Sequence, residues 1–258
     1  MPRTALIPAI RPVHVPKARE AIPYIHTYLR ECILDGTLTP GTKLSQVTLS
    51  EQLGISRTPL REVLRMLQEE GLVEIEPNQR TRVAGLDPAE LDDLYASRIL
   101  LETLALSTTL GSFGPPDRKE AKRLLTAMRQ AARMKDLPAW FAAHADFHRL
   151  ITAGAGDALR RQLTTYADRT IRYIRIYQQS DPHSWQSAGQ VEHAQILDAL
   201  VAGDERGALT GLAHHLARTA LRVLTDCAPD YVPGAVPHAV GLIDGRPPAQ
   251  LRQPGAAG

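Results

Sequence analysis

The segment from Leu53 to Leu67, which reads LGISRTPLREVLRML, restricts the fold of this chain more than any other. It contains the end of one apolar run, a turn at Gly54 and a second run with helical spacing. In the second run Leu60, Leu64 and Leu67 share one helix face, which is the spacing of a buried stripe. The segment therefore predicts two short helices joined by a tight turn.

The front of the second predicted helix carries hydroxyl and guanidinium groups. Hydroxyls and helix amino-terminal amides bind phosphate, and arginine can bind a guanine edge with two hydrogen bonds. We expect Arg61 to contact a base, Ser56 and Thr58 to contact phosphates, and Arg57 to reach either. The pattern indicates double-stranded DNA as a partner.

The surrounding segments predict a winged helix-turn-helix over residues 17–86. Helices are expected at 17–35, 47–53 and 56–70, and alternation predicts paired strands at 72–76 and 81–83. Arg80 and Arg82 on this wing, and Lys43 before the second helix, are expected to add phosphate or minor-groove contacts. The alternative is a solvated helix face on which the arginines pair with Glu62, Glu69 and Glu70.

Composition limits the class of protein but does not identify its function. The chain has 258 residues, 43% hydrophobic and 22% charged, with a formal net charge of +2, which is ordinary for a globular protein. Cys32 and Cys227 form no disulfide framework, and we find neither a signal peptide nor a membrane-spanning run. We therefore expect a cytoplasmic protein without membrane partners.

Beyond residue 87 the pattern is helical, so the predicted fold is mainly α. Turn residues separate six apolar-striped segments, which predicts an antiparallel six-helix bundle over residues 87–228. Proline-rich residues 1–16 are expected to form a flexible arm, and residues 229–258 a mobile Pro/Gly-rich tail. The six helices are expected at about 88–110, 116–135, 137–154, 157–180, 184–203 and 205–227.

Four histidines occupy helical positions that suit one shared site. His144 and His148 are one turn apart and project side by side, whereas Asp146 points to the other side of their helix. His193 and His215 lie on the last two predicted helices, and a bundle can bring all four inward around a metal ion. Taken singly, a histidine on an apolar helix face is more often a core or an incidental surface residue than a metal ligand.

The DNA-binding segment resembles the GntR family of bacterial transcription regulators. Its wing tip, Pro77-Asn78-Gln79-Arg80, departs from the family, which often has a glycine there after an arginine. The matching residues are Leu29, Ile33, Gly36, Leu38, Pro40, Gly41, Leu44, the run from Leu53 to Glu62, Leu67 and the run from Gly71 to Val73.

The helical part resembles the effector domain (FCD) of the FadR branch, and six helices match its VanR-like subgroup. The resemblance covers about residues 20–225 and implies a metal held by His148, His193 and His215, with His144 where the family usually has an aspartate. The alternative is three histidines plus water. A nitrogen-rich site suits zinc, nickel, copper or cobalt, with zinc or nickel expected first, better than magnesium or calcium.

Another family feature is an Arg-x-x-x-Glu signature, which matches Arg98 and Glu102. It implies that Arg98, with Tyr95 and Arg172 as further candidates, binds the carboxylate of a small anionic effector. The alternative is an intrahelical salt bridge between Arg98 and Glu102.

Together these features predict a ligand-responsive repressor that binds a palindromic operator as a homodimer and is not an enzyme. One alternative is a DNA-binding regulator whose metal is purely structural. A histidine-metal hydrolase is the other, but no Glu-x-x-His or His-Glu-x-x-His motif supplies a base beside the ligands.

Overall fold

The structure, a computed structural model, describes residues 10, 21–76, 80–85, 87–180 and 182–246. At residues 76, 80, 172, 175–180 and 182–188 it describes only the backbone. The chain divides into two compact units. The amino-terminal unit is Met1–Leu86 together with Ile171–Ile176, and the carboxyl-terminal unit is Asp87–Thr170 and Tyr177–Gly258.

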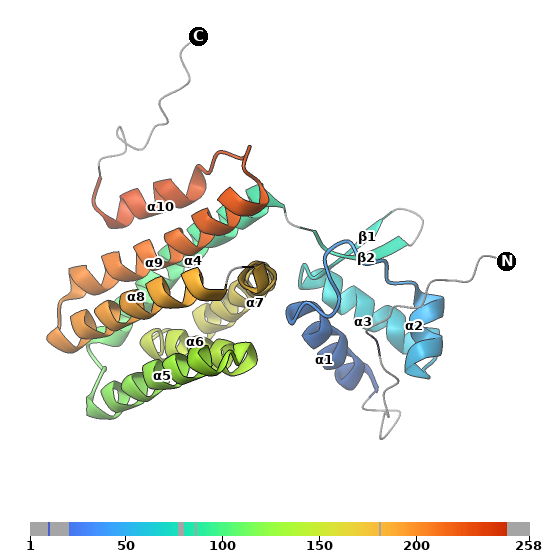
Figure 1. Cartoon of the computed structure of the whole chain (residues 1–258), viewed down its shortest axis with the longest axis horizontal. Helices are drawn as coiled ribbons and strands as arrows, with labels where there is room; N and C mark the ends of the chain where they lie inside the picture. Colours follow the sequence, from blue (N-terminus) through green and yellow to red (C-terminus); the bar gives the residue numbers. More distant parts are fainter. Residues whose placement is uncertain (1–9, 11–20, 77–79, 86, 181, 247–258) are drawn as a thin grey trace, which may run out of the picture. The chain divides into compact units, whose positions relative to one another are not determined.

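The amino-terminal unit is a winged helix-turn-helix, as predicted (Figure 1). The two strands are antiparallel, with Val73 opposite Val83 and Glu74 opposite Arg82. Lys43 forms an isolated bridge with Arg82, so the segment before α2 lies beside the wing. The elements are α1 (Ala21–Leu34), α2 (Gln46–Leu53), α3 (Arg57–Glu69), β1 (Val73–Glu76) and β2 (Arg80–Val83).

Local chemistry explains the turn between α2 and α3. The Ser45 side chain accepts a hydrogen bond from the Thr48 amide and so caps the start of α2. Gly54 ends the helix at φ +67°, a left-handed conformation that glycine adopts without steric cost. Leu53, Leu60 and Leu64 are at most 1% exposed, so their helices pack through the predicted leucine stripe.

The carboxyl-terminal unit is a helical bundle. Asp87, Asp136 and Asp204 cap the first, third and sixth of its helices, as aspartate before a helix does. Among the described helices, none has both the length and the apolar character needed to cross a membrane. The helices are α4 (Pro88–Leu110), α5 (Pro115–Met134), α6 (Leu137–Ile151), α7 (Asp157–Ser180), α8 (Pro182–Ala202), α9 (Glu205–Cys227) and α10 (Ala235–Ile243).

The last helix, α10, corrects the expectation of a mobile tail from residue 229 and of six helices in this unit. Pro237 occupies the first turn of α10, where a missing amide breaks no helical hydrogen bond. Within the unit α10 packs against α4 and α9, with α5 and α6 at the opposite side (Figure 1). It lies beyond residue 225, so the six helices within the range of the family resemblance are α4 to α9.

A buried carboxylate explains why α10 forms. Asp92 on α4 is 2% exposed and accepts hydrogen bonds from the amides of Gly234, Ala235 and Val236 at 2.8, 2.9 and 2.8 Å. The Tyr231 hydroxyl donates a further bond at 3.2 Å. These bonds satisfy amides that have no partner within the helix itself.

Replacing Asp92 by asparagine should therefore loosen α10. Hydrogen bonds to a charged acceptor are stronger than neutral ones, so we expect α10 to lose about 1 to 2 kcal/mol of local stability. The α10 amides should then exchange hydrogen roughly 5- to 30-fold faster, measured by mass spectrometry. The exposed neighbour Asp93→Asn is the matched control, and equal exchange rates in both variants would contradict the role of Asp92.

Candidate functional site

The exposed end of α3 carries the residues predicted to contact DNA. Ser56, Arg57, Thr58 and Arg61 are all exposed, whereas Leu60 on the opposite face is fully buried. Ser56 precedes the helix, and its side chain makes no capping hydrogen bond within the described residues. The hydroxyls, the first helix amides and two guanidinium groups thus lie together at one helix amino-terminus, an arrangement that attracts phosphate.

The acidic residues of this region have other partners, which argues against the solvated-face alternative. Arg65, one turn further along α3, binds both Glu62 and Glu69. Glu70 instead accepts from His26 at 2.5 Å and from Arg30 at 3.0 Å. Among the described residues, no ion pair within 4.0 Å involves Arg57 or Arg61, and their charge faces outward.

The described arginine of the wing is less available to DNA than the arginines at the start of α3. The Arg82 Nε donates to Glu74 at 3.0 Å, so an acidic cross-strand neighbour partly compensates its charge. Lys43 is exposed beside it. Arg80 lies in β2, but its side chain and the wing tip at residues 77–79 are outside the described residues. The phosphate or minor-groove contacts expected of Arg80 therefore stay a prediction.

In the carboxyl-terminal unit, three helices bring the four predicted histidines together. His144 and His148 come from α6, His193 from α8 and His215 from α9. One nitrogen of each ring lies within 4.8 Å of the corresponding nitrogens of the others. The imidazole of His144 also stacks on Trp140, with ring centroids 4.8 Å apart. Asp146, as expected, is elsewhere and binds the exposed Arg149.

Three of these imidazoles are held in the neutral form that binds a cation. Burial lowers the pKa of His193 and His144 well below 6.5, and the neighbouring histidines lower it further. Burial also lowers the pKa of His215 to about 4, although Glu192 opposes the shift. The Nε2 of His148 and both nitrogens of His193 are buried without a hydrogen-bond partner in the described part of the chain. Buried polar atoms normally have partners, so these unpartnered nitrogens fit the binding of a metal ion.

Two carboxylates bind the outer nitrogens of this cluster. Glu102 on α4 lies 3.2 Å from His148 Nδ1, and Glu192 on α8 lies 2.7 Å from His215 Nδ1. Burial opposes ionisation of Glu102, but Arg98 and His148 outweigh it and lower its pKa to about 2. An ionised carboxylate can only accept, so each Nδ1 carries the hydrogen, and the nitrogen left to bind a metal ion is Nε2.

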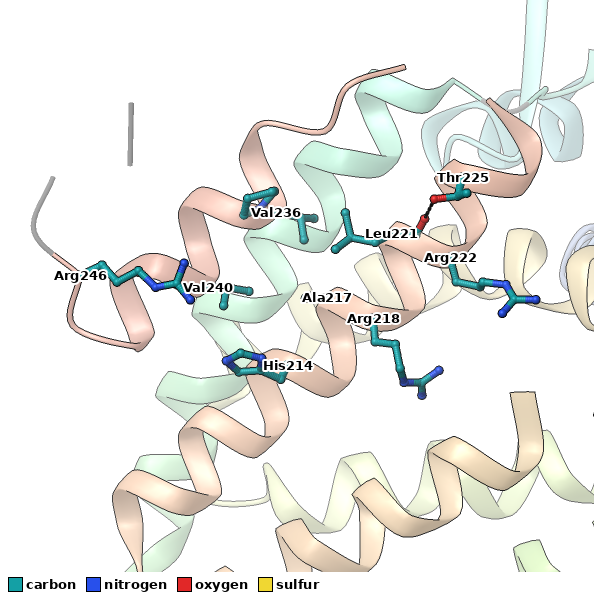
Figure 2. Close-up of a pocket in the computed structure, with 10 residues that line it drawn as sticks. His214, Ala217, Arg218, Leu221, Arg222, Thr225, Val236, Val240 and Arg246 are labelled. Atoms are coloured by element: carbon teal, nitrogen blue, oxygen red, sulfur yellow. Dashed lines mark hydrogen bonds between the residues drawn. The ribbon is translucent and has the colours of Figure 1, made fainter. Parts of the chain in front are cut away.

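Each of these carboxylates is also bound by an arginine. Arg98 Nε donates to Glu102 at 2.8 Å, and a second nitrogen donates to Thr170 at 2.8 Å. Arg218 binds the Glu192 carboxylate through two nitrogens, one of them at 2.6 Å. Arg218 also contributes to the lining of a groove of about 570 Å³ along α9 and α10, and Figure 2 shows its side chain directed away from α10.

Comparison with known proteins places both units in one family. Residues 24–83 match the bacterial regulatory proteins of the gntR family, and residues 93–218 match the FCD domain. A probable D-xylose utilization operon transcriptional repressor from Paenarthrobacter nicotinovorans is 30% identical over 212 residues, 82% of this chain and 87% of that protein. This chain belongs to the GntR family. It is thus a DNA-binding transcription regulator with a ligand-responsive FCD domain.

Two further matches agree with the GntR assignment. An uncharacterized HTH-type transcriptional regulator from Agrobacterium vitis is 36% identical over 133 residues, 50% of this chain and 77% of that protein. The solved structure of E. coli McbR/YncC superposes with a TM-score of 0.68 at 23% identity, covering 80% of this chain and 98% of that chain. At that identity the superposition supports the fold alone.

In this GntR regulator, the structure brings most of the predicted FCD residues together and leaves the position of one side chain undescribed. The four histidines lie together, and Arg98 joins them indirectly through Glu102. Arg98 forms the intrahelical salt bridge with Glu102 that was the alternative to an effector contact, and the pair is buried. Arg98 is 5% exposed, and its guanidinium lies 5.0 Å from the centre of the Tyr95 ring. Arg172 lies on α7, and its side chain is outside the described residues.

Sequence reasoning missed the part played by Glu192 and Arg218 in this GntR regulator. Glu192 directly precedes His193, and such a Glu-His pair was the only available signal. That signal would have misled, because Glu192 binds the histidine of the next helix rather than its neighbour in sequence.

Proposed function

We propose that this GntR regulator acts in the cytoplasm as a homodimeric repressor of a palindromic operator, and that a metal-bound small anion controls it. The four-imidazole cluster carries the proposal. One nitrogen from each of the four rings makes up the donor set expected of a transition-metal site, and the buried Nε2 of His148 and both nitrogens of His193 have no hydrogen-bond partner among the described residues. Because all four groups are nitrogen donors, zinc or nickel fits better than magnesium or calcium.

Charge balance supports an anionic effector. The four histidines are neutral ligands, and the carboxylates of Glu102 and Glu192 are each paired with an arginine. A divalent ion bound there would keep its double positive charge, which favours an anion at an open coordination position. Tyr95, Arg98 and Arg172 remain the predicted effector contacts, and an effector carboxylate would have to compete with Glu102 and Thr170 for Arg98.

The regulatory step would be a change in population between two arrangements of the DNA-binding units. An effector can shift such an equilibrium only by its difference in affinity for the two arrangements. A nearly complete switch needs about 5.5 kcal/mol of that difference.

DNA affinity measured with and without metal tests the proposal. The full-length protein would first be used to select its operator from a library of random duplexes. We then expect at least one carboxylate from a small-acid panel to change operator affinity roughly tenfold or more in the zinc-loaded protein and not after chelation. If chelation lowered the melting temperature while no acid altered DNA binding, the metal would be purely structural.

An uncharged face of α4 supports the homodimer. Between Ala96 and Leu110 the only ionisable residues are Arg98 and Glu102, and both are buried. Leu100 and Leu104, one turn apart, are 39% and 53% exposed. Depletion of charge around exposed apolar residues is typical of the centre of a protein interface. We propose that a second copy of the chain covers this face.

Leu104→Glu should therefore weaken the dimer. A buried unpaired carboxylate at the interface costs several kcal/mol, so the dimer dissociation constant should rise roughly tenfold or more, as measured by analytical ultracentrifugation. Met134→Glu at the end of α5 is the matched control, because Met134 is also apolar and is 78% exposed. Equal dissociation constants for the two variants would rule out the α4 face.

A further inference from the structure

Two series of hydrogen bonds with the same chemistry reach the histidine cluster, one from α4 and the other from α8 and α9. In one, Arg98 binds Glu102 and Glu102 binds His148. In the other, Arg218 binds Glu192 and Glu192 binds His215. Each series of hydrogen bonds runs from a guanidinium through a carboxylate to the Nδ1 atom of one imidazole. The other two histidines, His144 and His193, have no such carboxylate among the described residues.

The position of each carboxylate decides which ring nitrogen can bind an ion. A carboxylate fixed at Nδ1 holds the hydrogen there, so the unprotonated Nε2 faces the cluster. The negative charge beside Nδ1 also makes the ring a stronger donor toward a metal. The arginine in turn keeps the carboxylate from rotating, because it binds the oxygen that the imidazole leaves free; Arg218 also binds the oxygen that Glu192 shares with His215.

We propose that Glu102 and Glu192 are positioning residues of the metal site, and that Arg98 and Arg218 act on the site through them. The inference rests on the metal binding proposed above and assigns roles to four residues that are not ligands. His148 and His215 then bind the ion through Nε2. The two series of hydrogen bonds differ in how exposed their side chains are. The Arg98 and Glu102 side chains are 7% and 5% exposed, while those of Arg218 and Glu192 are 31% and 25% exposed.

The more exposed pair, Glu192 and Arg218, is the better one to test, because Glu102 and Arg98 are buried in the core of the unit and their replacement can unfold it. Glu192→Gln keeps the shape of the side chain and removes its charge. We expect the zinc affinity of the full-length protein, measured by competition with a chromophoric chelator, to fall about 10- to 100-fold. Asp198→Asn on the same helix is exposed and removes the same charge, so it should leave the affinity within about twofold.

A double-mutant cycle separates an indirect role of Arg218 from a general loss of positive charge. If Arg218 acts only through Glu192, Arg218→Gln should lower zinc affinity in the wild-type background and have no further effect beside Glu192→Gln. Equal effects of Arg218→Gln in both backgrounds would refute the assigned link. So would an unchanged affinity in Glu192→Gln.

The tautomers of the metal-free protein give a readout that does not depend on metal binding. Long-range proton-nitrogen NMR spectra of histidine-labelled protein at pH 7.5 should show the hydrogen on Nδ1 in His148 and His215. A hydrogen on Nε2 in either ring would overturn the positioning role, whatever the metal does. If the tautomers are as expected but the wild-type protein binds no zinc, the proposed metal site fails and the carboxylates merely brace the core.

Discussion

Changing His148 and His193 together to alanine should abolish metal binding while both units remain folded. The variant removes one ligand from α6 and one from α8, together with three of the buried nitrogens that lack partners. Two remaining imidazoles do not make a closed site, because transition-metal sites in proteins generally use three or four protein ligands. Metal content after reconstitution with zinc and gel filtration, measured by mass spectrometry, should fall from about one ion per chain to background.

Other histidines of the same chain provide a matched control. His214 and His238 are exposed, and His214 directly precedes a predicted ligand while binding Asp244 outside the cluster. The His214→Ala/His238→Ala variant should keep its metal. Normal zinc content in the His148→Ala/His193→Ala protein would end the ligand assignment, and loss of metal from both variants would point to binding elsewhere on the chain.

Arg61→Ala should weaken operator binding by about 1 to 3 kcal/mol, or roughly 5- to 150-fold. Arg61 is exposed one turn into α3 and has no ion pair within 4.0 Å among the described residues, so we expect the change to remove the predicted DNA contact without breaking the fold. If the contact is a pair of hydrogen bonds to guanine, preference at one base pair should also relax. Fluorescence anisotropy with the selected operator and its single-base variants measures both effects.

Arg65→Ala is the control for this experiment because it removes the same charge from the next turn of α3. The Arg65 guanidinium binds Glu62 and Glu69, so it is not available to a base. We expect a smaller loss of affinity, without change in base preference. Equal losses for the two variants would mean that Arg61 contributes only general electrostatic attraction to the DNA.

The order and approximate bounds of most helices could be predicted from the sequence, because they depend on residues that are close together in the chain. Apolar spacing, aspartate caps and turn glycines act within a few residues, and they placed α4 to α9 and the winged unit close to their observed bounds. The same reasoning failed at α10, where proline and glycine suggested a tail. The amides that start this helix bind Asp92, which precedes Val236 by 144 positions.

Helical periodicity was also sufficient to select the four histidines, because each lies on an inward face of its helix and the bundle joins these faces. Their surroundings depended on packing between helices. Glu102 reaches His148 across 46 positions and Glu192 reaches His215 across 23, and no local pattern encodes hydrogen bonds of that separation. The same holds for Glu70, which pairs with Arg30 on α1 and so leaves the outer end of α3 to its arginines. Short-range sequence patterns thus determine the helices, the strands and the candidate histidine ligands. The carboxylates and arginines that set the charge and the tautomer of those histidines come together only when the helices pack.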